Sequence, residues 1–345
     1  MEATATKLKF TAKQEDLLKL APLARIATKE PFNNIYTDGN VAWASNGLLT
    51  IHTTLDAMAQ GDCIAINAQK LYNIIAVSNG TITFDNGTIT AKGKKSKINS
   101  ISQDILPYKD ITGTDYTINA KEFINQLKRT VYACGEGLNS ILSGVLIDGT
   151  KLVATDENIL VANTLTAQVL DEQIILPSKF VDELVKVFAN AETLTMTTDK
   201  GAIKVTDGVT TIISRLLEGT YPKYQQLIPT SMANNAVIDR LALLDALSFA
   251  DTMINIKTNI AKLNFTQGQL EISTNSEDGE SNATIDIDYV GDDLLIAFNA
   301  QYLNKMLKSY NSSTVKIGMN SNLSATLITD GVSEDVVLIM PIQLR

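Results

Sequence analysis

The chain has 345 residues, of which 45% are hydrophobic, and its formal net charge is -9. This length allows two or three domains with buried cores, but no apolar run approaches the roughly 18 residues of a membrane span, and residues 1–10 lack the apolar segment of a signal peptide. A folded cytoplasmic protein is therefore predicted, and its negative charge disfavours a nucleic-acid partner unless cations gather locally.

Two helices are predicted in each of three similar units. The opening helix of each unit is predicted by an amphipathic segment, in chain order "FTAKQEDLLKLAPLARIA" from Phe10, "INAKEFINQLKRTVYAC" from Ile118 and "VIDRLALLDALSFADTMI" from Val237. The second helix has apolar residues at helical spacing in "INAQKLYNII" from Ile66, "LPSKFVDELV" from Leu176 and "FNAQYLNKML" from Phe298.

Strands follow each second helix in the same order. Alternating Thr and aliphatic residues around a turn predict antiparallel hairpins with one wet face in "GTITFDNGTITAKG", "ETLTMTTDKGAIKVTDG" and "STVKIGMNSNLSATLITDG". Each unit then ends on a strand that stops at a proline (Pro107, Pro222 and Pro341), and these prolines lie about 115 residues apart.

The shared period predicts an α+β fold made of three tandem repeats of one domain, each with two helices packed on sheets rich in antiparallel pairs. The predicted domains are residues 1–114, 115–232 and 233–345, with linkers in "GTDYT" and "SMANNA". Three unrelated α+β modules with chance similarity are the alternative.

Residues suited to catalysis are sparse. His52 is the only histidine and stands in a predicted strand, so it is the best candidate of a hydrolase hypothesis but more typical of a surface or satisfied residue. Cys63 and Cys134 have no metal or redox spacing, and "GEGLNSILSG" lacks the lysine of a phosphate loop. The acidic "SEDGESNATIDID" lacks calcium-loop spacing and predicts a turn with a charged edge strand. No catalytic residue, cofactor or metal is predicted.

Charge is distributed unevenly. The six predicted helices together carry a small net positive charge although the chain is acidic, even though Asp239, Asp245 and Asp251 make one of them negative. Tandem domains with helices on one face can close into a ring whose helices line the hole, and a cationic lining attracts a polyphosphate. A simple solvated helix face is the alternative interpretation.

The terminal "VLIMPIQLR" from Val337 allows two interpretations, a strand in a core or an apolar surface for a partner. Together with "LSGVLIDGTKLVATDENILVANT", "RLLEGTYPKYQQLIP" and "IAFNAQYLNKML", it resembles the bacterial processivity clamp of replicative DNA polymerase, the β sliding clamp family. The resemblance extends over nearly the whole chain, and "EGTYPKYQQLIP" and "MPIQL" are specific in combination.

The resemblance implies a head-to-tail homodimer that forms a six-domain ring around duplex DNA. Such a ring has no catalytic activity; it tethers the replicative polymerase, the clamp loader and other DNA-processing proteins through a hydrophobic peptide-binding pocket. The alternative is a clamp-fold interaction scaffold that binds partner peptides without encircling DNA.

Matching positions assign three sets of residues by this resemblance. The pocket would use Leu142, Thr155, Ile159, Leu160, Pro222, Gln226, Leu227, Leu338, Ile339, Met340, Pro341 and Ile342. Contacts to the DNA backbone would come from Arg25, Lys70, Lys128, Arg129, Lys179 and Lys305, and "KGKKSK" from Lys92 is either a further phosphate contact or a solvated charge run. The dimer contact would lie near Ile98 and Ile101 in one chain and Met253 and Ile254 in the other.

The chain departs from the family's pattern at its pocket. Glu157, Asn158 and Ile159 stand where relatives commonly have Gly-His-Arg, and Gln226 and Gln343 stand where they have Arg. These departures predict a less cationic pocket and a diverged set of partners.

Overall fold

The computed structural model describes residues 7–101, 110–137 and 140–344, and the predicted strand ending at Pro107 lies outside them. The chain forms two compact units, here called unit 1 (Met1–Lys121 and Glu183–Leu216) and unit 2 (Glu122–Asp182 and Leu217–Arg345). No helix within the described residues is long and apolar enough to cross a membrane.

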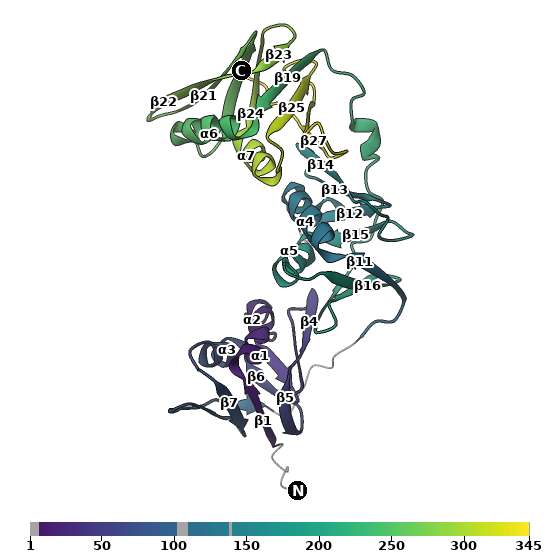
Figure 1. Ribbon diagram of the computed structural model, residues 1–345, viewed down its shortest axis with the longest axis vertical. Coiled ribbons are helices and arrows are strands. Elements are labelled where there is room, and N and C mark those ends of the chain that lie inside the picture. Colours follow the sequence, from purple (N-terminus) through teal and green to yellow (C-terminus); the bar gives the residue numbers. More distant parts are fainter. Residues whose placement is uncertain (1–6, 102–109, 138–139, 345) are drawn as a thin grey trace. The chain divides into compact units, whose positions relative to one another are not determined.

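Three successive stretches of chain repeat one order of elements (Figure 1): a strand, a helical segment, several strands, a further helix and at least three more strands. The first stretch contains β1 (Leu8–Lys13), α1 (Gln14–Leu17), the 3-10 turn η1 (Leu18–Leu20), α2 (Ala21–Ile26), β2 (Asn34–Thr37), β3 (Val41–Ser45), β4 (Leu49–Thr54), β5 (Ala57–Gly61), β6 (Ile64–Asn67), α3 (Ala68–Ala76), β7 (Thr81–Asp85), β8 (Thr88–Ala91), β9 (Lys94–Lys97) and β10 (Ser100–Ile101).

The second and third stretches follow the same order. The second contains β11 (Thr114–Asn119), α4 (Ala120–Thr130), η2 (Val131–Ala133), η3 (Ile141–Ser143), β12 (Gly144–Asp148), β13 (Lys151–Thr155), β14 (Ile159–Thr164), β15 (Ile174–Pro177), α5 (Ser178–Val187), β16 (Thr193–Asp199), β17 (Ala202–Thr206), β18 (Thr210–Arg215) and η4 (Tyr224–Leu227). The third contains β19 (Asn234–Asp239), α6 (Arg240–Ala250), η5 (Asp251–Met253), β20 (Ile260–Thr266), β21 (Gln269–Ser276), β22 (Gly279–Asp286), β23 (Asp288–Val290), β24 (Leu294–Asn299), α7 (Ala300–Ser309), β25 (Thr314–Met319), β26 (Thr326–Thr329) and β27 (Val336–Ile339).

The repeats and the antiparallel hairpins confirm the predicted α+β fold. The predicted opening helices, however, begin too early, because β1, β11 and β19 occupy their first residues. Each of these strands pairs with a strand that follows the second helix of its repeat. "GTDYT" is correspondingly mostly strand rather than linker, and "SMANNA" runs into β19.

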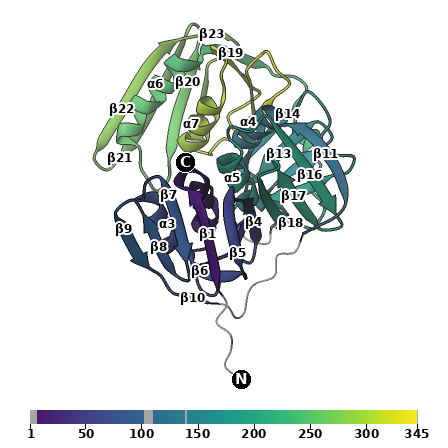
Figure 2. The same ribbon diagram turned by 60° about the horizontal axis from the view of Figure 1, so that its bottom comes forward.

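The starts of the second helices have a local cause that the sequence repeats. Asn67 caps α3 by accepting the Lys70 N–H, and Asn299 caps α7 by accepting the Gln301 N–H. Both asparagines stand in the same "NAQ" triplet of their repeats. The two helices of the third repeat, α6 and α7, lie side by side, and α6 lies across β21 and β22 (Figure 2).

Hydrogen-bonded sheets join the repeats. In unit 1 the order β10-β6-β2-β3-β4-β18-β17-β16-β11 places Ile51 of β4 opposite Ile212 of β18. In unit 2 the order β15-β12-β13-β14-β27-β26-β25-β19-β23 places Leu160 of β14 opposite Leu338 of β27. The same two strands of neighbouring repeats therefore meet at both junctions.

Two smaller sheets have no such continuation within the described residues. The five-stranded sheet β5-β1-β7-β8-β9 of unit 1 ends at β9, and the four-stranded sheet β22-β21-β20-β24 of unit 2 ends at β22. By position in the repeat, β9 corresponds to β18 and β27, whereas β22 corresponds to β4 and β14.

Candidate functional site

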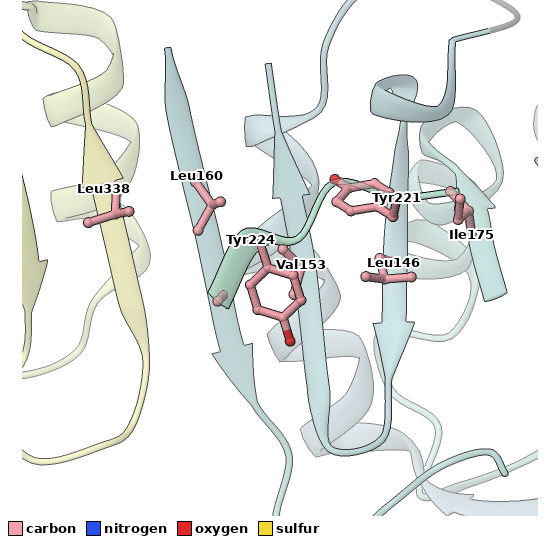
Figure 3. Packing of buried hydrophobic residues seen from close by; sticks show 8 residues of the cluster. Leu146, Val153, Leu160, Ile175, Tyr221, Tyr224 and Leu338 are labelled. Atoms are coloured by element: carbon pink, nitrogen blue, oxygen red, sulfur yellow. The ribbon is translucent and has the colours of Figure 1, made fainter. Parts of the chain in front are cut away.

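A hydrophobic cluster covers one face of the junction sheet in unit 2 (Figure 3). The name Leu338 cluster is used here for its buried residues Leu146, Val153, Leu160, Ala162, Ile175, Tyr221, Tyr224 and Leu338. Neighbouring strands β27, β14, β13, β12 and β15 each supply an aliphatic side chain, and the segment that holds Tyr221 and Tyr224 crosses in front of them (Figure 3).

Alternation along the strands decides which predicted pocket residues share this face. Leu160 and Leu338 lie opposite each other and belong to the cluster, whereas Ile159 and Ile339 form the next pair and point to the other face. Ile159 and Ile339 are 1% and 0% exposed. The assignment of Ile159 and Ile339 to the pocket is therefore corrected, because both belong to the core beneath the sheet.

The remaining predicted residues lie at or around the cluster to different degrees. Leu142 packs against it while partly buried, and Thr155 is buried two residues after Val153 on the same strand face. Leu227 is 57% exposed and Met340 is 42% exposed, so both offer apolar surface to a partner. Pro222 and Gln226 are exposed, and Pro341 and Ile342 are half-buried.

The end of the chain contains both a core strand and an exposed apolar surface, the two interpretations of the terminal sequence. β27 is buried from Val337 to Ile339, and apolar side chains are exposed again at Met340 and Leu344. Backbone bonds hold this tail, because the Met340 N–H donates to Asn158 O at 2.8 Å and the Ile342 N–H donates to Ala297 O at 2.7 Å. The tail is therefore positioned beside the loop of residues 156–158.

That loop is fixed by its own polar groups. Asp156 Oδ1 accepts the N–H groups of Asn158 and Ile159, each at 2.9 Å, and its other oxygen accepts the hydroxyl of Tyr302 on α7. Burial, followed by the proximity of Asp156, raises the pKa of Tyr302 to about 12, so this phenol stays protonated and donates at neutral pH. Glu157 adopts a left-handed backbone with φ of +76°, a conformation that glycine adopts without steric cost.

Tyrosines are the site residues that the sequence prediction missed. Tyr224 packs its ring on the cluster and donates its hydroxyl to Asp148 Oδ2 at 3.0 Å, and Gln225 Nε2 donates to the same oxygen at 3.1 Å. Burial and the Asp148 carboxylate raise the pKa of Tyr224, which keeps it a donor. The "YPKY" sequence of residues 221–224 carries this signal, although the resemblance assigns only Pro222 of these four residues to the pocket.

The predicted phosphate contacts divide into two groups. Lys70, Lys128, Lys179 and Lys305 are exposed on α3, α4, α5 and α7, and none forms an ion pair within the described residues. Arg25 is paired with Glu183 at 2.8 Å.

Arg129 is a correction to the predicted phosphate contacts. Its side chain is only 12% exposed and is paired with Asp335 at 2.8 Å, so this cation is already neutralised inside unit 2.

The residues predicted to form the dimer contact differ in their exposure. Ile98 is 7% exposed and belongs to the core of unit 1, so it is corrected from a surface contact to a packing residue. Ile101 is exposed in β10. Met253 is partly exposed next to the edge strand β22, since its sulfur would lie 3.8 Å from a Cβ at Gly279. The "KGKKSK" segment forms β9 and its turn, at the other open edge.

The chain can be compared with known proteins on this basis. The family model "DNA polymerase III beta subunit, central domain" matches residues 117–223, and "DNA polymerase III beta subunit, C-terminal domain" matches residues 225–343. The Beta sliding clamp of Synechococcus elongatus is 27% identical over 322 residues, which cover 86% of each chain. That of Pseudomonas putida is 30% identical over 229 residues, covering 63% of this chain and 62% of that protein.

Solved structures share the fold. The sliding clamp of Bartonella birtlesii bound to griselimycin has a TM-score of 0.89 and 21% identity, with 98% of this chain and 100% of that one covered. The DNA polymerase III beta subunit of Thermotoga maritima has a TM-score of 0.88 and 17% identity at the same coverage. The fold is thus that of a polymerase sliding clamp. The chain belongs to the DNA polymerase III beta subunit family, a family of non-catalytic accessory subunits.

Proposed function

We propose that two copies of this chain close head to tail into a six-domain ring around duplex DNA. The ring tethers a replicative polymerase, a clamp loader and other DNA-processing proteins in the cytoplasm through the Leu338 cluster. Its three domains per chain are residues 1–114, 115–232 and 233–345. The observation that carries the proposal is that both internal junctions use equivalent strands, while one further pair of equivalent strands, β9 and β22, stays open at sheet edges.

Ring closure follows from repeating that junction between copies. Pairing β22 of one copy with β9 of the other would join a four-stranded sheet to a five-stranded sheet and reproduce the size of the two nine-stranded junction sheets. Open strand edges readily add another strand. Two copies supply two such pairs, which leaves neither of these edges exposed.

The charges of the two edges are complementary. Strand β9 and its turn carry Lys92, Lys94, Lys95 and Lys97 with no acidic residue between them. Strand β22 and its flanks carry Glu277, Asp278, Glu280, Asp286 and Asp288 with no basic residue between them. Opposite charges across an interface favour this pairing and discourage pairing of β9 with β9 or of β22 with β22.

Four exposed lysines support the DNA contact. Lys70, Lys128, Lys179 and Lys305 each stand on a helix, and none is neutralised by a carboxylate within the described part of the chain. Lysines that touch phosphates bind without reading bases, and this kind of contact weakens steeply with salt. A clamp needs such a contact because it must slide.

The Leu338 cluster supports the tether. Exposed Met340 and Leu227 extend an apolar surface whose centre is held by buried aliphatic residues and two tyrosine rings. Apolar anchors inserted into such centres carry most of the binding energy of peptide interfaces. We expect a short peptide with Gln and bulky apolar residues to bind here.

The scaffold without DNA remains the second candidate, and one observation favours it. Arg25 and Arg129 are neutralised by Glu183 and Asp335, which removes two of the six predicted phosphate contacts in a chain of net charge -9. This scaffold would bind the same peptides but would not bind DNA.

One experiment separates the two candidates. The mass in solution at micromolar concentration is measured, and retention on nicked circular plasmid is compared with retention on the same plasmid after linearisation. A clamp is dimeric, stays on the circle after loading and slides off the linear form. A monomer that is retained on neither form would contradict the proposed ring.

A further inference from the structure

A buried ion pair stands at the start of the strand that carries Leu338. Arg129 of α4 lies 2.8 Å from Asp335, and their side chains are 12% and 1% exposed. The guanidinium also lies over the Tyr310 ring, 5.3 Å from its centroid. Removal of two charges from water is costly, so a pair at this depth needs an explanation other than stability alone.

The pair lies at one end of the β14–β27 ladder, where β14 ends and β27 begins. The second carboxylate oxygen of Asp335 accepts the N–H of Thr164, the last residue of β14, at 2.8 Å. Arg129 donates to Gln126 at 2.9 Å, and Gln126 donates to the carbonyl of Thr164 at 2.9 Å. Both backbone groups of Thr164 are thereby tied to side chains whose positions depend on the ion pair.

Hydrogen bonds within residues 330–335, the segment before β27, also fix the position of Asp335. Asp330 accepts the N–H groups of Val332 and Ser333 at 2.9 and 2.8 Å, and the Ser333 hydroxyl accepts the N–H of Asp335 at 3.2 Å. These turns fix where Asp335 enters the sheet. The distance from Asp335 to Leu338 along the strand is then set by covalent geometry.

Hydrophobicity alone specifies the register of β27 poorly. Val337, Leu338 and Ile339 are all aliphatic and all buried, so a slip by one residue would replace one buried aliphatic side chain with another on each face. Register is strongly specified where one face is polar and weakly where both faces are alike. The same slip would remove Leu338 from the Leu338 cluster and shift Met340.

We propose that the Arg129–Asp335 pair is a positioning device that sets the register of β27 and so places Leu338 and Met340 for peptide binding. Its role in binding rests on the proposed function, whereas its role in register does not. Arg129 and Asp335 act through the strand and touch no bound peptide.

The register is tested by disulfide trapping in a Cys63→Ser, Cys134→Ser background. Leu160→Cys with Leu338→Cys reports the native register, and Leu160→Cys with Ile339→Cys reports a slip by one residue. We expect only the first pair to cross-link in the parent chain and both pairs to cross-link once Arg129→Met and Asp335→Asn are added. Cross-linking that stays confined to the native pair would overturn the proposal.

Peptide affinity is tested with a fluorescein-labelled pentapeptide containing Gln, two Leu and a terminal Phe. We expect the double variant Arg129→Met, Asp335→Asn to bind at least 10-fold more weakly than the parent. Its midpoint of urea unfolding should stay near the parent value, since no buried charge is left unpaired. The matched control Arg25→Met removes an ion pair from unit 1 and should bind within 2-fold of the parent.

The two proposals fail in different ways. A parent chain that binds no peptide, yet shows the slip in the double variant, contradicts the tether and keeps the register device. A double variant that binds the peptide within 2-fold of the parent contradicts the register device and leaves the tether intact.

Discussion

Glu157 shows how a single residue can hold a strained turn beside the Leu338 cluster. It holds a left-handed backbone, and its N–H donates to Thr155 Oγ1 at 3.1 Å, so the turn is kept although a side chain is present. A non-glycine residue in this region costs about 1–2 kcal/mol. The turn is therefore held in a conformation that is strained for a residue with a side chain.

Glu157→Gly is expected to stabilise the protein. The gain from relieved backbone strain exceeds the entropy lost by glycine on folding, for a net of about 0.5–1 kcal/mol in the free energy of urea unfolding. Asn158→Gly is the matched control, because Asn158 has no left-handed backbone and the same change there should destabilise. A Glu157→Gly variant less stable than the parent would contradict the strain argument.

His52 should affect stability through pH and should have no part in catalysis. Burial lowers its pKa, and nearby Asp110 opposes this shift without cancelling it. The unfolded chain therefore binds the proton more tightly, so the contribution of neutral His52 is complete above pH 6.5 and is lost as the pH falls.

Measurements on His52→Gln isolate this effect. The free energy of unfolding of the variant, relative to the parent, should rise as the pH is lowered from 7.5 to 5, because only the parent must protonate a half-buried imidazole. A difference that stays constant with pH would argue against burial of His52 as a neutral group.

At the scale of elements, β27 and the tail after it have separate tasks. The strand completes the junction sheet, whereas Met340 to Leu344 leave apolar surface exposed. Deletion of residues 340–345 should therefore abolish binding of the labelled pentapeptide, since loss of each central anchor costs about 2 kcal/mol or more. Thermal unfolding should stay cooperative with a modestly lower midpoint. A deleted chain that no longer folds would mean that the tail is a core element.

The predictability of these elements followed the strength of their local signals. The second helices and the hairpins were predictable, because Asn caps, helical spacing and Asn-Gly turns act within a few residues. The opening strands β1, β11 and β19 were not, since their partners lie far along the chain and the apolar spacing continues into the helix. Long-range pairing overrode the local pattern there.

The site was predictable in its segments but not in its faces. The resemblance assigns residues 159, 160, 338 and 339 all to the pocket. Only the register of β14 with β27 shows which residue of each neighbouring pair belongs to the cluster. Arg129 could not be separated from Lys128 by sequence, because its partner Asp335 is more than 200 residues away. No residue near Arg129 in the sequence indicates that Asp335 pairs with it and that its side chain is buried.

At the scale of the whole molecule, the open edges give a charge-swap prediction. Lys94→Glu with Lys95→Glu in β9, or Glu280→Lys with Asp286→Lys in β22, should each convert the protein to monomer, because like charges then face each other across both interfaces. An equimolar mixture should form dimers again, since one interface is restored and the other carries exchanged charges. Masses from sedimentation check this, and variants that stay dimeric on their own would contradict pairing of β9 with β22.

The pairing of β4 with β18 and of β14 with β27 also constrains how the protein folds during its synthesis. Each later strand leaves the ribosome roughly 160–180 residues after the strand with which it pairs, which at ~5–20 residues per second is a delay on the order of ten seconds or more. During that interval β4 or β14 has an unpaired edge, and an unpaired strand edge can pair wrongly with a strand of another chain. The sheets that join the repeats therefore cannot be completed until a late part of the chain has been synthesised.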